Sequence, residues 1–381
     1  MAKHTSKRKK DILANEEKRL LLNPDRAERE KKKRRAKIAA FCVGIPVTII
    51  VMACLGVLLV GAVGKARLRQ VSAQQPQLAE APAAEMPTEE ETEIWQEGWV
   101  KYQGQIYAYN EDILTFLFMG VDQRGETVKE VAEGTNGGQA DALFLLVLDP
   151  HDQTASIIGI NRNTMTEIDI YNEDGAYVDT VIAQIAVQHG FGNGVEKSCE
   201  YQKKAVSRLF YSLPIHGYAA INMNAIATLN DEVGGVDITV LEDMSSESPR
   251  LAEGERVHLE GADALTYVRY RDTDAFASAD RRLERQKQYL TEFVKAARST
   301  VQQDLSSVVR LYQALSPMMV TDISADEAVY LASQALDYKI DTDNFYMLKG
   351  ETVMGEQFEE YNIDEEALYE LILQIFYEPV S

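Results

Sequence analysis

The sequence predicts a mixed α/β fold: a central mixed β-sheet flanked by helices and preceded by one transmembrane helix. Short apolar runs bounded by polar residues have the length and composition of buried strands. Segments with apolar residues at helical spacing alternate with these runs along the chain, which favours an α/β arrangement. A separate run of 27 residues without a charge, 38–64, exceeds the ~20 residues needed to cross a bilayer.

Three apolar runs are expected to form strands of the central sheet. They cover residues 113–121, 142–148 and 155–160. The turn-rich segment 149–152 separates the last two runs and predicts that they pair in the antiparallel sense. A further strand is expected at 235–240, and helices are expected at 199–211, 225–233, 283–297, 325–335 and 365–376.

The charges around the uncharged run predict its orientation in a membrane. Residues 1–37 carry 15 Lys/Arg and 6 Asp/Glu, a net charge of +9. Because the whole chain has a net charge of −21, the rest of the chain carries −30. Because positive charge is retained on the cytoplasmic side, residues 1–37 are expected in the cytoplasm and the main domain outside. A cleaved signal peptide is the alternative. However, the apolar run is longer than that of the usual signal peptide, and the charged segment before it is also longer. The expected location is the cell membrane, with a single pass.

The chain beyond the membrane divides by composition into three parts. Residues 65–94 are rich in Ala, Pro, Gln and Glu and are expected to form a flexible linker. Aromatic residues from Trp95 on mark the start of a folded extracellular domain at 95–300. Residues 301–381 are expected to be a helical part packed on the same domain.

Composition also excludes some functions. The strongly acidic main domain argues against binding nucleic acid, which requires a basic surface. Cys42 and Cys54 lie in the uncharged run, so Cys199 is alone in the main domain and cannot form a disulfide within it. No cluster of Cys and His has the spacing of a zinc site.

Charged side chains follow the predicted strands at positions where ligand sites commonly form. Asp122 and Arg124 follow the first strand, Asp141 opens the second after a glycine-rich stretch, and Arg162 follows the third. If the strands are neighbours, these side chains meet at one rim of the sheet. A cap at a strand end is the alternative role for each aspartate.

A second cluster places five arginines within residues 269–285 of an otherwise acidic chain. We expect Arg269 and Arg271 to lie in an extended segment and point to the same side. On the helix that follows, Arg282, Arg285 and Gln286 share one face, because they are spaced three and four residues apart. Guanidinium groups match phosphate oxygens in bidentate fashion, which favours a phosphate site over a solvated face of Arg–Glu pairs.

Aspartates beside such arginines suit a divalent ion. Mg²⁺ is typically held by one or two carboxylates together with phosphate oxygens and water. Asp122 and Asp141 are therefore the candidate ligands for Mg²⁺ or Mn²⁺, which would bridge oxygens of a pyrophosphate.

Six segments of the sequence, in this order, resemble the LytR-CpsA-Psr family, and together they span about residues 100–300. They are FLFMGVDQR (116–124), ADALFLLVLDP (140–150), SIIGINRNTMTEI (156–168), LNDEVGGVDITV (229–240), LEGADALTYVRYR (259–271) and DRRLERQKQYL (280–290). The resemblance implies an α/β fold with a long apolar groove for a polyprenyl chain. It also implies Mg²⁺-assisted transfer of a glycopolymer, such as a teichoic acid or capsule, from a polyprenyl-pyrophosphate carrier to peptidoglycan.

The resemblance assigns roles to particular residues. Asp122 and Asp141 match the metal-site aspartates of the family. Substrate contacts are implied for Gln286, Asp280 and Asn163, and the catalytic or pyrophosphate-contacting arginines are implied to be Arg124, Arg162, Arg269, Arg271, Arg282 and Arg285.

The sequence departs from the family pattern at three places. The usual Pro-Arg-Asp is Asn161-Arg162-Asn163 here, which removes a negative charge at 163. Gln139-Ala140 replaces the arginine that usually precedes Asp141. The spacing around Asp280 also differs, so Asp274 could take its role.

The change at Asn163 leaves a second hypothesis open, a polyprenyl-pyrophosphate-binding sensor with weak turnover, which the substitution Asn163→Asp would separate from an enzyme. A regulatory nucleic-acid contact by the basic N-terminus is a third hypothesis. Attraction of those lysines to anionic lipids is the simpler explanation.

Overall fold

The computed structural model describes residues 71, 74–121, 138–172, 174–272, 275–336, 338–339 and 344–380. The chain divides into two units, Met1–Val63 and Gly64–Ser381, and every described residue belongs to the second. The predicted cytoplasmic segment and membrane span lie outside the described residues, as do Asp122, Arg124 and Asp274. Within the described ranges, no helix is both long and apolar enough to span a bilayer.

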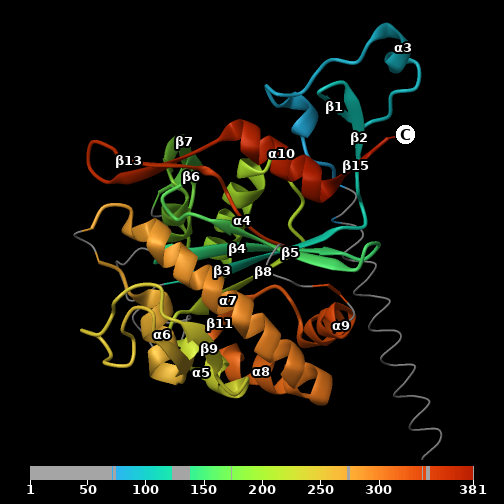
Figure 1. Ribbon diagram of the computed structural model, residues 1–381. Helices are drawn as coiled ribbons and strands as arrows, with labels where there is room; N and C mark the ends of the chain where they lie inside the picture. The colour runs from blue at the N-terminus through green and yellow to red at the C-terminus, as the bar shows by residue number, and fades with distance from the viewer. Residues whose placement is uncertain are drawn as a thin grey trace, which may run out of the picture. The chain divides into compact units, whose positions relative to one another are not determined.

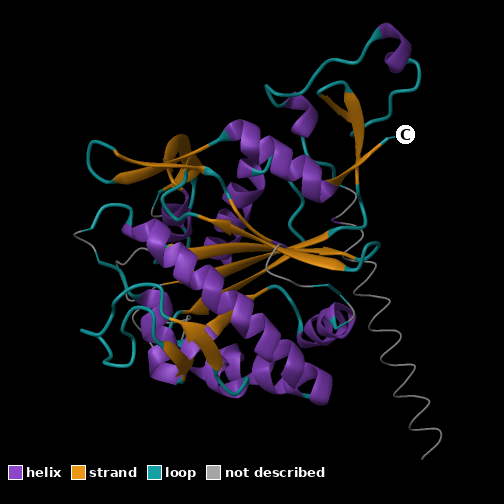
Figure 2. Cartoon of the chain, viewed as in Figure 1, coloured by secondary structure: helices purple, strands orange, loops and turns teal. Residues whose placement is uncertain are grey.

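A six-stranded mixed sheet forms the centre of the second unit (Figures 1 and 2). Parallel pairing joins β3 to β8 and β5 to β12, whereas the other three neighbouring pairs are antiparallel. The predicted central mixed sheet and its predicted antiparallel pair, β4 with β5, are therefore confirmed. In sheet order the strands are β11 (Met319–Thr321), β8 (Gly217–Asn222), β3 (Leu114–Val121), β4 (Ala140–Asp149), β5 (Thr154–Ile160) and β12 (Phe345–Met347).

Helices cover both faces of this sheet (Figure 1). Because side chains alternate along a strand, Leu117 and Met119 of β3 enter the main hydrophobic core, whereas Phe116 and Phe118 point to the opposite face. The core face packs against α4 (Glu196–Leu209) and α10 (Glu365–Phe376). The opposite face is covered by α7 (Ser278–Gln303), α8 (Ser307–Leu315) and α9 (Ala325–Ala335).

Smaller elements surround the two layers. One three-stranded sheet and three hairpins lie outside the central sheet, together with short helices. They are β1 (Val100–Tyr102), β2 (Gln105–Tyr109) and β15 (Tyr377–Pro379); β6 (Met165–Tyr171) with β7 (Tyr177–Gln184); β9 (Val236–Thr239) with β10 (Arg256–Leu259); β13 (Gly350–Met354) with β14 (Glu359–Ile363); and η1 (Leu78–Glu80), α3 (Glu89–Thr92), η2 (Ile185–Phe191), α5 (Ala225–Glu232), α6 (Gly261–Arg269) and η3 (Ser316–Met318).

The C-terminal part is not only helical, which corrects the prediction for residues 301–381. Strands β11 and β12 belong to the central sheet, and β13, β14 and β15 form smaller pairings. The strands of this region that enter the central sheet have three residues each, too short to show a periodic apolar pattern.

Part of the segment predicted to be a flexible linker is packed on the fold. The backbone N–H of Gln77 donates to the carbonyl of Tyr211 at 2.7 Å, and Leu78 is fully buried in the main core. Farther along, Thr88 caps α3 and Glu85 bridges to Lys101. The polar composition of the segment concealed this packing because one leucine supplies most of the apolar contact.

Shortening Leu78 to alanine is expected to lower the free energy of unfolding by about 3 kcal/mol, since it opens a cavity in a buried core. Met86, which is 86% exposed in the same segment, supplies the control: Met86→Ala should change stability by less than about 0.5 kcal/mol. Thermal unfolding followed by circular dichroism measures both. Equal, small effects of the two substitutions would mean that this segment does not stabilise the domain.

Candidate active site

Helix α7 presents one buried face to the rest of the molecule, as its spacing predicts. Arg282, Arg285, Gln286 and Tyr289 are all buried, whereas the neighbouring Arg281 is exposed. The expected common face is therefore confirmed. The burial of two guanidinium groups on one helix requires charged or hydrogen-bonding partners nearby.

The first turn of α7 is fastened to two strands by Asp280. Its carboxylate accepts hydrogen bonds from Asn161 Nδ2, at the end of β5, and from Thr352 Oγ1 of β13 at 2.6 Å. A carboxylate in the first turn is also favoured by the positive end of the helix dipole. Asp280 thus serves to set the position of the helix that carries the arginines.

Asp141 of β4 connects the arginine that follows β5 to the arginine on α7. Its Oδ1 lies 2.6 Å from Arg162 Nη1, and its Oδ2 lies 3.7 Å from Arg282 Nη1. The carbonyl of Asp141 also accepts from Arg282 Nη2 at 3.4 Å. The expectation that Asp141 and Arg162 meet at one rim of the sheet is confirmed, and Arg282 joins them there.

Positive charge is concentrated around Arg282. The pKa of its guanidinium is lowered to about 10, chiefly by burial and also by the nearby charges of Arg162, Arg271 and Arg285, while Asp141 opposes this shift. Asp141 is the single carboxylate that forms an ion pair with Arg282 among the described residues. An additional anion beside Arg282 would therefore be stabilised by this excess of positive charge.

Arg271 is held at the edge of the same cluster. Its Nε donates to Ser278 Oγ at 2.9 Å, and its Nη2 lies 3.6 Å from Glu359 Oε2. The prediction that Arg269 and Arg271 share one side of an extended segment is wrong, because Arg269 is the last residue of helix α6. Arg269 is exposed, so the two side chains do not form the expected row.

Arg285 is committed to the fold. Its side chain is almost completely buried, its Nε donates to the carbonyl of Tyr267 at 3.1 Å, and its Nη2 donates to the carbonyl of Tyr270. Its Nη1 pairs with Glu242, which also accepts from Arg281 at 3.2 Å. Burial lowers the pKa of Arg285, and Glu242 counteracts this. Arg285 thus holds the end of α6 in place and does not present an open fork to a ligand.

Asn163 likewise makes its contacts within the fold. Gln184 Nε2 donates to its side-chain oxygen at 3.1 Å, and the N–H of Tyr361 donates to its carbonyl at 2.9 Å. The residue is buried and joins the β6–β7 hairpin to β14. It was expected to contact substrate, but its described contacts are structural.

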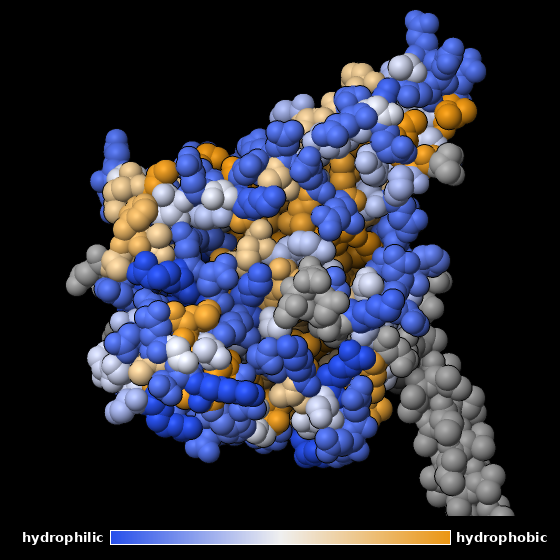
Figure 3. Space-filling view, in the orientation of Figure 1, coloured by the Kyte–Doolittle hydropathy of each residue, from blue (hydrophilic) through white to orange (hydrophobic). Residues whose placement is uncertain are grey.

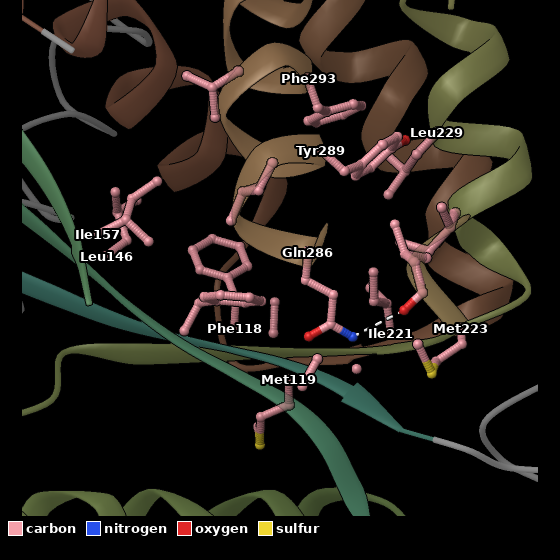
Figure 4. A pocket seen from close by; sticks show the side chains of 18 of the residues that line it. Phe118, Met119, Leu146, Ile157, Ile221, Met223, Leu229, Gln286, Tyr289 and Phe293 are labelled. Atoms are coloured by element: carbon pink, nitrogen blue, oxygen red, sulfur yellow. Dashed lines mark hydrogen bonds between the residues drawn. The ribbon is translucent and has the colours of Figure 1, made fainter. Parts of the chain in front are cut away.

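Gln286 lines an apolar cavity between α7 and the sheet, and its side chain points into it (Figure 4). The cavity has a volume of about 340 Å³, and Gln286 Nε2 donates to the carbonyl of Val268 at 3.1 Å. Phe118, on a central strand, is 40% exposed because it faces this space. Figure 4 shows Tyr289 and Phe293 above the cavity, on the helix that carries Gln286. On the face that Figure 3 shows, hydrophilic residues predominate, and hydrophobic residues are visible in the hollow and in scattered patches.

The described carboxylates alone do not form a metal centre. Within the described ranges, no group of three or more His, Cys, Asp or Glu residues could hold a metal ion. Asp141 Oδ1 is nevertheless a buried oxygen without a hydrogen bond, since its contact with Arg162 lacks hydrogen-bond geometry. A carboxylate oxygen in this state fits a cation that takes its remaining ligands from phosphate and water.

Sequence reasoning missed the two glutamates that hold the arginines. Glu242 pairs with Arg285, and Glu359 pairs with Arg271 and accepts from the N–H of Ala277 at 2.8 Å. Each lies on a different element from its partner and far from it in sequence, so no local pattern signals the pairing.

The fold and the site together define an α/β protein in which a cluster of arginines lies one helical turn from the lining of an apolar cavity. Such an arrangement suits an amphiphile with an anionic head and a hydrocarbon tail. The chain belongs to the LytR_cpsA_psr family, whose model matches residues 77–374.

Two curated relatives are similar over part of the chain. A TagU from Bacillus mycoides (strain KBAB4), named polyisoprenyl-teichoic acid–peptidoglycan teichoic acid transferase, is 28% identical over 214 residues, or 56% of this chain and 62% of that protein. The TagU of Halalkalibacterium halodurans is 26% identical over 216 residues, or 57% of this chain and 63% of that protein. The matched region thus spans less than two thirds of each relative.

Solved structures share the fold. TagV of B. subtilis has a TM-score of 0.53 at 19% identity and covers 70% of this chain and 97% of its own. Protein gbs0355 from Streptococcus agalactiae reaches 0.56 at 20% identity, covering 69% and 86%. TagT bound to LI-WTA reaches 0.52 at 18% identity, covering 69% and 89%. These similarities show that the α/β fold is shared with the three solved structures.

Proposed function

We propose that the protein is a membrane-anchored phosphotransferase that moves a glycopolymer from a polyprenyl-pyrophosphate carrier to peptidoglycan. The observation that carries this proposal is that Arg162 and Arg282 both pair with Asp141, whose neighbour Ala142 lines an apolar cavity together with Gln286, one helical turn beyond Arg282. The names of the TagU relatives, which specify a polyisoprenyl-linked teichoic acid and peptidoglycan, support the same substrate class.

The proposed binding mode uses each part of the site for one part of the donor. The prenyl tail enters the cavity past Gln286, and the pyrophosphate remains at the mouth. Arg162 and Arg282 contact its oxygens and stabilise the charge that develops on the leaving phosphate. Arg271, whose charge also acts on Arg282, is assigned to the glycan-bearing phosphate in this binding mode.

The proposed reaction exchanges one phosphate ester for another. An acceptor hydroxyl oxygen attacks the phosphorus next to the glycan, and the bond from that phosphorus to the bridging oxygen breaks. Polyprenyl phosphate leaves with that oxygen, the glycan becomes joined to the acceptor by a phosphodiester, and the hydroxyl proton passes to water. The arginines lower the barrier because they hold the phosphates in place and neutralise the leaving group.

We further propose that Mg²⁺ or Mn²⁺ binds at Asp141, with Asp122 as the second protein ligand. When bound, the ion would supply charge neutralisation at the pyrophosphate oxygens. The buried Asp141 Oδ1 without a hydrogen bond supports this assignment. The membrane anchor at 38–64 and the extracellular position of the main domain belong to the same proposal.

The proposal of a weakly active sensor has lost its main support. It depended on Asn163, whose side chain accepts from Gln184 and whose backbone binds Tyr361. Because this residue joins two hairpins, its change from aspartate does not by itself indicate a loss of turnover.

The test uses the full-length chain in detergent micelles with a polyprenyl-pyrophosphate-linked glycan. We expect release of polyprenyl phosphate with Mg²⁺ and its loss after chelation with EDTA. Asp141→Asn should reduce the rate by about 100-fold, because it weakens the binding of the ion and removes the ion pairs with Arg162 and Arg282. Asp152→Asn, in an exposed turn of the same hairpin, is the matched control and should be fully active. An unchanged rate with EDTA would reject the metal, and an unchanged rate in Asp141→Asn would reject the site.

A further inference from the structure

We propose that Glu359 is the general base that removes the proton from the acceptor hydroxyl. This inference rests on the proposed function, because it concerns the same transfer reaction. It deepens that function by assigning the proton transfer to a carboxylate at the start of β14, which no local sequence pattern indicates.

The two carboxylate oxygens of Glu359 differ in their surroundings. Oε1 accepts a hydrogen bond from the backbone N–H of Ala277 at 2.8 Å. Oε2 is buried and accepts no hydrogen bond, and it lies 3.6 Å from Arg271 Nη2. The side chain is only 11% exposed, so bulk water reaches little of it. A buried oxygen without a donor costs free energy unless a bound molecule supplies that donor, and an acceptor hydroxyl can do so.

Three other carboxylates described at the site have other roles. Asp280 accepts a hydrogen bond at each of its oxygens. Each oxygen of Glu242 contacts an arginine of α7. The two oxygens of Asp141 contact two further arginines, and this residue is the proposed metal ligand. Asn163 carries an amide, which does not take up a proton near neutral pH. Glu359 is therefore the carboxylate among these four whose second oxygen remains for an acceptor hydroxyl.

The contact between Glu359 and Arg271 puts the carboxylate close to the phosphorus that reacts. In the proposed binding mode, Arg271 holds the glycan-bearing phosphate, and the hydroxyl attacks the phosphorus of that group. A phosphate oxygen on Arg271 Nη2 lies at most about 6.4 Å from Glu359 Oε2, since the ion contact measures 3.6 Å and a charge-assisted hydrogen bond about 2.8 Å. A hydroxyl oxygen within hydrogen-bond reach of a base and in attack position bridges about 6 Å between base and phosphorus. One hydroxyl therefore fits between Glu359 and this phosphate.

Hydrogen bonds fix Glu359 relative to the rest of the site. Gln184 Nε2 donates to the carbonyl of Glu359 at 2.7 Å and to Asn163 Oδ1 at 3.1 Å, so it joins β14 to the residue that follows Arg162. On the other side, Ala277, whose N–H donates to Glu359, directly precedes α7. A carboxylate held from both sides is preorganised for proton transfer, because it need not move when the hydroxyl binds.

The proton transfer completes the balance of the reaction. As the hydroxyl oxygen forms its bond to phosphorus, its proton moves to Glu359 Oε2, and the electron pair of the O–H bond stays on the attacking oxygen. The bond from phosphorus to the bridging oxygen breaks, and that oxygen leaves with polyprenyl phosphate. Glu359, now a carboxylic acid, releases the proton to water after the products leave. Before the transfer, the charge of Arg271 stabilises the carboxylate.

The first test is Glu359→Gln in the full-length protein, with a polyprenyl-pyrophosphate-linked glycan as donor and a peptidoglycan oligosaccharide as acceptor. The amide keeps an oxygen for the N–H of Ala277 but takes up no proton. We expect kcat to fall by about 100-fold, within the range for a general base, while donor affinity measured by calorimetry falls by no more than about twofold. Glu356→Gln removes the same charge at an exposed position of the same hairpin, and it should leave kcat within about twofold of wild type.

Chemical rescue separates proton transfer from the positioning of Arg271. Glu359→Ala removes the base and leaves room for a small carboxylate. Formate should raise the kcat of Glu359→Ala at least about tenfold, because it supplies a base in place of the missing side chain. Chloride at the same ionic strength should not raise it, and formate should not accelerate the wild type. Each comparison is made within one protein, so a partial loss of fold cannot imitate rescue.

These outcomes separate the inference from the function on which it rests. A kcat of Glu359→Gln within about threefold of wild type would overturn the general base. A loss of donor affinity in Glu359→Gln, with no rescue of Glu359→Ala by formate, would also overturn it and would leave Glu359 as a residue that positions Arg271. A wild type that releases no polyprenyl phosphate in the presence of donor and acceptor would overturn the proposed function instead.

Discussion

Replacing Arg282 by alanine is expected to lower kcat/KM for glycopolymer transfer by about 10³, the cost typical of removing one positioned donor from a charged transition state. Arg282 is buried and lies near the charges of three other arginines, so its site favours an additional anion. Most of the loss should appear in kcat, because the leaving phosphate gains charge only in the transition state. Steady-state kinetics with the polyprenyl-pyrophosphate donor measure the change.

The adjacent Arg281 is the matched control for this prediction. It has the same charge on the next position of the same helix, but it is exposed and pairs with Glu242. Arg281→Ala should therefore change kcat/KM by less than about threefold, since exposed ion pairs contribute little. Similar losses in both variants would indicate a general effect of positive charge and would reject the specific role of Arg282.

Replacing Arg285 by alanine is expected to destabilise the protein by about 3 kcal/mol. The substitution removes donors to the carbonyls of Tyr267 and Tyr270, and it leaves Glu242 without its buried partner. Circular dichroism should report a lower melting temperature. Because Glu242 is partly exposed and can be hydrated, the loss is expected at the lower end of the range for a broken buried ion pair.

Two comparisons identify the cause of that destabilisation. Arg310→Ala removes an exposed arginine that pairs with Asp304, and it should change stability by less than about 0.5 kcal/mol. The double variant Arg285→Ala with Glu242→Ala should lose less stability than the sum of the two single variants, since both substitutions remove the same ion pair. An Arg285→Ala protein with the wild-type melting temperature and strongly reduced transfer would instead assign Arg285 to substrate.

Most of the fold could be predicted because its longer elements carry strong periodic signals. The runs that became β3, β4 and β5 are continuous and apolar, and the face of α7 that holds Arg282 and Gln286 follows directly from helical spacing. The three-residue strands β11 and β12 could not be predicted, because their pairing depends on neighbours supplied by the rest of the chain. The burial of Leu78 could not be predicted either, since a single apolar residue forms no periodic pattern.

The site was predictable in its residue types but less so in its pairings. The segment with Arg269 is predicted to be extended, but it ends helix α6. Ala264, Tyr267 and Val268 have the spacing of a buried helical face. The sequence grouped Arg282 and Arg285 as equivalent, yet tertiary contacts separate them. Arg282 contacts Asp141 at 3.7 Å, whereas two carbonyls and Glu242 enclose Arg285.

The most direct test of the central claim is an experimental structure of the full-length protein with a polyprenyl-pyrophosphate donor. The account predicts phosphate oxygens within hydrogen-bonding distance of Arg162 and Arg282, with the prenyl chain passing Gln286 into the cavity toward Phe118. Phosphates bound away from these two arginines, or a tail lying outside the cavity beneath α7, would contradict it.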